Sequence, residues 1–183
     1  MNSEPFHPLE TQRLQLRCVA ADDAAPTSIM MTPEVSRWIA HWPLPFTLEM
    51  AIVRIEGMRK LAFIRDAMPF AVVEKVSNEL IGWVVITRDN KKPGLGSLGY
   101  WLGEKHHGKG YMKELAPIVL GAAFEWLKLD VIEAAAQPAN TGSFKVMQAC
   151  GMKRAGEGMV YAPARQQEEL CYFYEIKRPS LII

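Results

Sequence analysis

Residues 99–112 constrain the fold more than any other part of the sequence. They begin as a β-rich run, pass through a glycine-bearing loop at residues 103–111 and open directly into a run with helical periodicity. The first turn of a helix leaves backbone N–H groups unpaired and carries a partial positive charge, so phosphate groups bind there readily. Gly108 and Gly110 have no Cβ, which lets a pyrophosphate approach the main chain closely. The stretch predicts a strand, a pyrophosphate-binding loop and a helix start.

Two other phosphate-binding motifs come close to matching this region. Gly103, Gly108 and Lys109 fit the P-loop spacing G-x-x-x-x-G-K. The next residue of a P-loop must be Ser or Thr to hold magnesium, and here it is Gly110, which argues against an NTPase. Residues 94–99 match the dinucleotide pattern G-x-G-x-x-G, but a predicted strand follows them where that fingerprint requires a helix.

Strand-like and helix-like segments alternate along the rest of the chain. The order is strand, helical region, three strands, helix, strand, helix and two strands. Strands are expected at 11–19, 69–75, 80–87, 97–102, 131–136, 158–162 and 170–177, and helices within 22–60, at 111–128 and at 141–149. Hairpins give antiparallel neighbours and a strand–helix–strand crossover gives a parallel pair, so this order predicts an α/β (α+β) fold with a mixed sheet.

Composition limits the class of protein. A chain of 183 residues with 49% hydrophobic and 22% charged residues is ordinary for one globular domain, expected to span residues 1–183. The formal net charge of +1 argues against a nucleic-acid or membrane-surface partner. No apolar run reaches the roughly 18 residues that a membrane span needs, and no signal sequence is seen, so a cytoplasmic protein is expected. Cys18, Cys150 and Cys171 have no metal-binding spacing and are expected to be reduced thiols.

Read along nearly its whole length, the chain resembles the RimJ/RimL branch of the GNAT superfamily, which comprises ribosomal-protein N-terminal acetyltransferases and their relatives. The residues 105–114 resemble that branch's version of the acetyl-CoA loop, whose general pattern would run here from His107 to Met112. The further blocks that carry the resemblance are residues 11–17, residues 42–47 with Glu49 and Ala51, residues 80–82, residues 99–102, and the set Asn140, Ser143, Gly151 and Met152, with Met152 standing where Phe is usual.

This resemblance implies a GNAT fold, with a mixed, mostly antiparallel sheet of about seven strands, splayed central strands and flanking helices. It also implies acetyl-CoA as cosubstrate and no metal. The amides of the loop would hold the pyrophosphate, β-rich residues before it would pair with pantetheine, and Asn140 would bond to the pantetheine arm. Lys109 can be read as a phosphate ligand or as a solvated charge. The implied cofactor-binding residues are Tyr100, Trp101, Leu102, His107, Gly108, Lys109, Gly110, Tyr111, Met112, Asn140 and Ser143.

The same resemblance implies two catalytic groups. The backbone N–H of Leu102 would stabilise the oxyanion, and the Ser143 hydroxyl would protonate the departing thiolate; the alternative role of Ser143 is a helix cap or a pantetheine contact. Many GNAT enzymes use a Tyr as the acid, but Met147 occupies that position. For the general base only a region can be given, with Glu49, Glu74, Glu168 and Glu169 as candidates that are equally readable as surface carboxylates.

Aromatic residues at a helix–loop junction within the predicted helical region 22–60 offer a further hypothesis. Trp38, Trp42 and Phe46 would either line an acceptor pocket or belong to the core. His106 and His107 are adjacent, so their side chains diverge, and no third ligand for a metal is evident.

Three functions fit this pattern. The first is an acetyl-CoA-dependent N-acetyltransferase acting on a protein or peptide N-terminal α-amine. The second is an N-acetyltransferase acting on a small amine such as a polyamine, an antibiotic or an amino acid, and the third is an acyl-CoA-binding regulator without turnover. The expected partners are acetyl-CoA and the amine acceptor, in a monomer or a homodimer.

Overall fold

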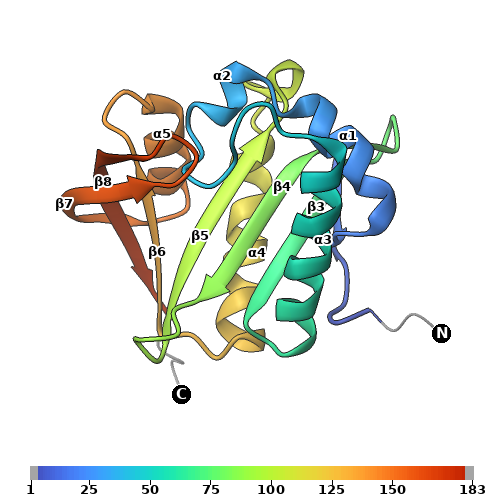
Figure 1. The fold of residues 1–183 in the computed structure, drawn as a ribbon. Helices are drawn as coiled ribbons and strands as arrows, with labels where there is room; N and C mark the ends of the chain where they lie inside the picture. The colour runs from blue at the N-terminus through green and yellow to red at the C-terminus, as the bar shows by residue number, and fades with distance from the viewer. Residues whose placement is uncertain (1–3, 180–183) are drawn as a thin grey trace.

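The computed structural model describes residues 4–179, which build one eight-stranded sheet in the order β1-β2-β3-β4-β5-β6-β8-β7 (Figure 1). All neighbouring strands are antiparallel except β5 and β6, which confirms a mixed, mostly antiparallel sheet. The eighth strand, β1, has only two residues, too few to show an alternating pattern. The strands are β1 Leu9–Glu10, β2 Leu14–Cys18, β3 Ala67–Glu74, β4 Glu79–Arg88, β5 Leu95–Leu102, β6 Val131–Ala136, β7 Lys153–Ala162 and β8 Gln167–Lys177.

The helices cover both faces of this sheet (Figure 1). Helices α1 and α3 contact each other and lie over β3 and β4, whereas α4 and α5 contact each other and β6 on the opposite face. None of the helices in the part of the chain described here is long and apolar enough to cross a membrane. The α-helices are α1 Ala24–Met30, α2 Pro33–Ser36, α3 Leu48–Phe63, α4 Tyr111–Trp126 and α5 Thr141–Ala149, and the 3-10 turns are η1 Ala21–Asp23 and η2 Glu104–His106.

Local sequence signals set the helix ends. The Thr47 hydroxyl accepts a hydrogen bond from Met50 N at 3.3 Å and caps α3, as its residue type before an apolar helical run predicts. Pro33 occupies the first turn of α2, where its missing N–H has no cost. Gly151 follows α5 with φ of +82°, the left-handed position at which glycine often ends a helix.

Periodicity in the sequence places the core correctly. Leu14, Leu16 and Cys18 on β2 are buried while the residues between them are partly exposed, as the period of two predicts. On α4, the helical spacing predicts a stripe of five core residues, of which three are fully buried and two, Ala122 and Trp126, only partly; the buried three are Leu115, Val119 and Ala123.

The most consequential feature of the sheet is that β5 and β6 part halfway along. They are paired only from Leu95↔Val131 to Ser97↔Glu133. Beyond that point β6 remains paired with β8, while β5 continues to Leu102 beside β4 alone, and the two strands diverge (Figure 1). The splayed central strands are thereby confirmed, and they leave an open strand edge inside the sheet.

Candidate functional site

A cavity of about 540 Å³ is lined by the free end of β5, the loop that follows it, and the first turns of α4 and α5. Helix α2 and the residues just after it close the cavity on another side, through Val35 and Trp38. Of the eleven predicted cofactor-binding residues, Lys109 alone does not line it. The ten that do are Tyr100, Trp101, Leu102, His107, Gly108, Gly110, Tyr111, Met112, Asn140 and Ser143.

The loop before α4 has the backbone of an anion-binding site. Gly108 and Gly110 have φ of +73° and +77°, a region that costs residues with a Cβ about 1–2 kcal/mol. Gly110 is the N-cap of α4 and supplies no side-chain cap. Glu114 N is the first amide to bond back, to Gly110 O at 3.1 Å, so the N–H groups of residues 111–113 have no partner within the helix. Unpaired amides at a positive helix end fit a phosphate group.

The open edge of β5 also presents backbone groups to the cavity. Gly103 N donates to Ile81 O on β4 at 2.9 Å, and the alternation of an antiparallel ladder therefore turns the N–H groups of Leu102 and Tyr100 away from β4. The carbonyl of Leu102 accepts a hydrogen bond from His107 Nε2 at 2.7 Å, which requires the proton to be on that nitrogen. The Leu102 N–H thus faces the gap between β5 and β6.

Helix α5 holds its first turn against β5. Asn140 is its N-cap, with Oδ1 accepting from Ser143 N at 3.2 Å, so the helix-cap interpretation of Ser143 is wrong. The Tyr100 hydroxyl donates to Ser143 O at 3.2 Å, and burial raises the pKa of Tyr100 to about 12. The Ser143 hydroxyl itself has no hydrogen-bond partner among residues 4–179, and it stands at the cavity wall.

The predicted aromatic wall of the acceptor side divides into two parts. Trp38 lines the cavity, whereas Trp42 and Phe46 are each only 6% exposed and belong to the core. The centre of the Trp42 ring lies 5.3 Å from the centres of the Trp83 and Trp101 rings. Trp42 therefore packs against Trp101, which lines the cavity.

Two buried nitrogens at the cavity lack partners within the described residues, Trp101 Nε1 and His106 Nδ1. Burial also lowers the pKa of His106, which favours its neutral form. Buried polar atoms are normally hydrogen-bonded, so these two are exceptions among the described residues, and with almost no accessible surface neither faces the open cavity.

None of the four carboxylates considered as general base lines the cavity. Glu169 is bound by Arg165 Nε at 2.5 Å, and this hydrogen bond, with those from two glutamines, lowers its pKa to about 2. Glu74 accepts a hydrogen bond from the Tyr111 hydroxyl, which lowers the pKa of that carboxyl, and lies behind the loop. Glu49 and Glu168 are exposed on α3 and β8.

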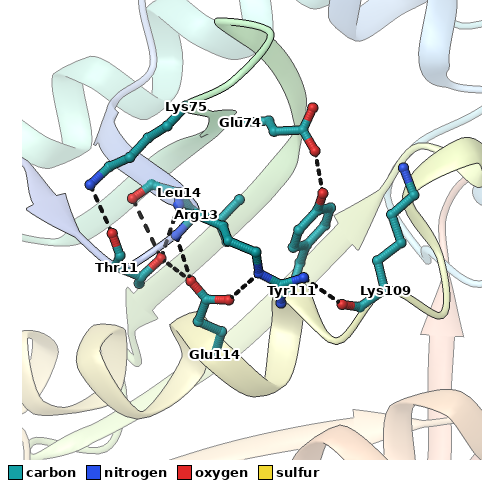
Figure 2. A network of polar contacts seen from close by, with 8 residues as sticks. All are labelled: Thr11, Arg13, Leu14, Glu74, Lys75, Lys109, Tyr111 and Glu114. Atoms are coloured by element: carbon teal, nitrogen blue, oxygen red, sulfur yellow. Dashed lines mark hydrogen bonds and ion pairs between the residues drawn. The ribbon is translucent and has the colours of Figure 1, made fainter.

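A polar network lies behind the loop, outside the cavity (Figure 2). Glu114 on α4 accepts hydrogen bonds from Arg13 Nε at 2.6 Å, from Arg13 N at 2.9 Å and from the Thr11 hydroxyl. Arg13 Nη1 also donates to Lys109 O at 2.9 Å, and its guanidinium carbon lies 4.5 Å from the centre of the Tyr111 ring. Lys109 therefore contributes its carbonyl to the network, while its ammonium lies 5.9 Å from the centre of the same ring, on the outer side.

Sequence reasoning missed several residues of the site. Lys113 and Lys145 line the cavity and bring positive charge to it. Lys113 is in the first turn of α4 and Lys145 follows Ser143 by two residues, so their proximity to the predicted loop was the available signal. Arg13 gave no such signal, because its ion-pair partner is 101 residues away in the sequence.

Comparison with known proteins agrees with this geometry. The chain matches the family model of the acetyltransferase (GNAT) domain over residues 13–153. It is 30% identical over 150 residues to the uncharacterized N-acetyltransferase p20 of Bacillus licheniformis, covering 81% of this chain and 83% of that protein. The structure of ribosomal-protein-S5-alanine acetyltransferase from Vibrio fischeri has a TM-score of 0.77 at 26% identity, covering 94% of this chain and 97% of that one. Mycobacterium smegmatis RimJ, in complex with CoA-disulfide, has a TM-score of 0.81 at 21% identity, with 97% and 88% covered.

Proposed function

Because the chain belongs to the GNAT acetyltransferase family and is an acetyl-CoA-dependent N-acetyltransferase, we propose that its acceptor is the N-terminal α-amine of a protein or peptide. The observation that carries the proposal is the charge of the cavity. Within the described part of the chain, no Asp or Glu lines it, while Lys113 and Lys145 do. The similarity to a ribosomal-protein acetyltransferase at 26% identity supports the same class of acceptor.

The amine must be neutral to attack, and acceptors differ in how much help they need. A peptide α-amine has a pKa of about 7.7–8, so a sizeable fraction is neutral near pH 7 without a strong base. A lysine-like amine with a pKa of about 10.4 is neutral in only about one molecule in a few thousand at that pH. A polyamine would also find no carboxylate in the described lining of the cavity to bind its charges. The cavity favours the α-amine on both counts.

The residues of the cavity fit acetyl-CoA. In this proposal the amides from Gly108 to Met112 bind the pyrophosphate, while the predicted His107 amide is already bonded to Glu104 O at 3.1 Å; Lys113 and Lys145 add positive charge beside the pyrophosphate. The unpaired edge of β5 from Tyr100 to Leu102 pairs with the amide-bearing pantetheine arm. The Oδ1 of Asn140 already accepts the capping hydrogen bond of α5, so the contact with the pantetheine arm is made by its Nδ2 group, which donates.

Two groups of the chain assist the transfer. When bound, acetyl-CoA supplies the acetyl group as a thioester, which the neutral amine attacks. The Leu102 N–H, turned into the gap, donates to the oxygen on which negative charge develops. The free hydroxyl of Ser143 relays a proton: it donates its own proton to the departing thiolate and takes up the one that the attacking amine releases as the amide forms. Met147 stands where many relatives have Tyr, but it is 1% exposed and packs in the core, away from this chemistry.

Intact mass spectrometry after incubation with acetyl-CoA tests the acceptor class. One peptide has a free N-terminus and no lysine, a second has a blocked N-terminus and an internal lysine, and spermidine is the third substrate. We expect the first peptide alone to be acetylated efficiently. We also expect kcat/KM to rise with pH and to level off above about pH 8, as the α-amine becomes neutral. Faster acetylation of the lysine peptide or of spermidine would refute the proposal.

A further inference from the structure

We propose that Arg13 is a positioning residue, which aims the Gly110 amide at the pyrophosphate without touching the cofactor itself. This inference rests on the role proposed above for the loop of residues 107–112. Arg13 is the residue just before β2, which begins at Leu14, and it is not among the residues that line the cavity. Any influence it has on the ligand must pass through the residues that it holds.

The inference depends on the geometry of the peptide bond between Lys109 and Gly110. Arg13 Nη1 binds Lys109 O at 2.9 Å (Figure 2). A trans peptide is planar, so its carbonyl and its N–H point in opposite directions. The N–H of this peptide belongs to Gly110, which lines the cavity. By holding the carbonyl on the outer side, Arg13 directs the Gly110 N–H to the opposite side, where the cavity lies.

Arg13 is itself held by the helix that it serves. Glu114 binds Arg13 Nε and Arg13 N at 2.6 and 2.9 Å, and it also accepts from the Thr11 hydroxyl. Glu114 N closes the first turn of α4 on Gly110 O at 3.1 Å. One guanidinium thus connects the peptide just before the first turn to the side chain just after it. This clamp fixes the turn whose free amides face the ligand.

Tyr111 ties the same turn to a second strand. Its ring is 6% exposed and lies 4.5 Å from the guanidinium carbon of Arg13, and its hydroxyl donates to Glu74 at the end of β3. Because the charge of Arg13 is compensated by Glu114 at 2.6 Å, Arg13 is not a free cation for phosphate. Arg13 and Tyr111 therefore orient the loop, and this orientation affects only the part of the ligand that the loop binds.

Binding of ligand fragments tests this inference without using turnover. CoA is titrated into Arg13→Gln by calorimetry, and ADP and pantetheine by NMR, since ADP carries the pyrophosphate and pantetheine lacks it. We expect the Kd of CoA and of ADP to rise about tenfold, as for loss of one hydrogen bond from a charged donor. The Kd of pantetheine should stay within about twofold. Lys75→Gln is the matched control, because Lys75 binds Glu10 and Thr11 O nearby but does not touch the loop (Figure 2).

Each further outcome has a distinct meaning. Equal weakening of pantetheine and CoA would show a general structural effect and overturn the inference. If Gly110→Asp weakens CoA and Arg13→Gln does not, Arg13 has no positioning role but the proposed loop role stands. If neither variant weakens CoA, the loop role and the inference both fail. Should Arg13→Gln not fold, Glu114→Gln breaks the same clamp with a neutral group of the same shape, and the same selective loss for CoA and ADP is expected.

Discussion

Replacing Gly110 by Asp, with Asn as the matched control, tests whether a pyrophosphate lies against the loop. Gly110 has φ of +77°, and an added Cβ would meet only Arg13 Nη2, at 3.7 Å. Neighbouring atoms therefore do not exclude a side chain, and the main structural cost is the left-handed backbone. That cost is about 1–2 kcal/mol for most residues and less for Asn and Asp, which tolerate this region. Asp and Asn have nearly the same shape, so their difference isolates the charge, and both are also compared in an Arg13→Gln background, where the carboxylate has no guanidinium to pair with.

The size of the charge effect follows from Coulomb's law. A carboxylate about 5 Å from one phosphate charge, at an effective dielectric constant between about 20 and 80, is repelled by about 1–3 kcal/mol. This corresponds to roughly a 5- to 150-fold rise in the Kd of CoA for Asp relative to Asn. The strain of the left-handed backbone is common to both variants and cancels in this ratio.

Calorimetric titration of CoA into the wild type and both variants measures this ratio. We expect Gly110→Asn to bind somewhat more weakly than the wild type, and Gly110→Asp at least fivefold more weakly than Gly110→Asn at low ionic strength. The Asp–Asn difference should shrink near 1 M salt, where the Debye length is about 3 Å. If the two variants bind CoA within twofold of each other at low salt, no pyrophosphate lies near Gly110, and the reasoning is refuted.

Three further predictions concern other parts of the site. Ser143→Ala should lower kcat by about a hundredfold while the KM for acetyl-CoA stays within about twofold, in initial-rate assays; an unchanged kcat would leave Ser143 as a contact only. The pKa of Glu169 is lowered from its usual 4.5 to about 2, so its stabilisation is complete above about pH 4.5 and is lost as the pH falls toward 2. Chemical denaturation across that window should show a shallower loss of stability in Glu169→Gln, and equal slopes would argue against the Arg165 pairing. In Gly82→Ala the new Cβ would lie 2.2 Å from Trp101 O, so β4 and β5 must separate; we expect about 1–3 kcal/mol lower unfolding free energy, and an unchanged melting curve would contradict this.

Local chemistry made the centre of the fold predictable. The bounds of β6 and α5 match the sequence expectation, because each is a short, well-patterned segment between clear turn signals. The start of β7 was missed, since Lys153–Ala162 begins with charged residues and glycines on an exposed edge strand. The apolar residues of α3 repeat with a helical period only roughly, because Ile52 and Val53 are apolar yet 42% and 69% exposed and lie outside its buried stripe.

The candidate site was also predictable only in part. The loop glycines, the open strand and the start of α5 are adjacent to recognisable elements, so the sequence indicated them. The pairing of Arg13 with Glu114 brings together the residue just before β2 and the first turns of α4, 101 residues apart, which no local pattern encodes. The four candidate carboxylates were chosen by region, and the structure places them outside the cavity because they face solvent or other partners. Long-range side-chain partners are therefore what the sequence alone did not reveal.

The parting of β5 and β6 has an evolutionary consequence. A ligand gripped mainly by main-chain amides and carbonyls does not depend on which side chains stand along that edge. Substitutions at such positions can accumulate while the cofactor is retained, provided the backbone path survives. This chain and the Vibrio fischeri enzyme share the fold along nearly their full lengths with only 26% of residues identical. Val35 and Trp38 line the cavity from other elements, so changes there would leave this backbone edge intact.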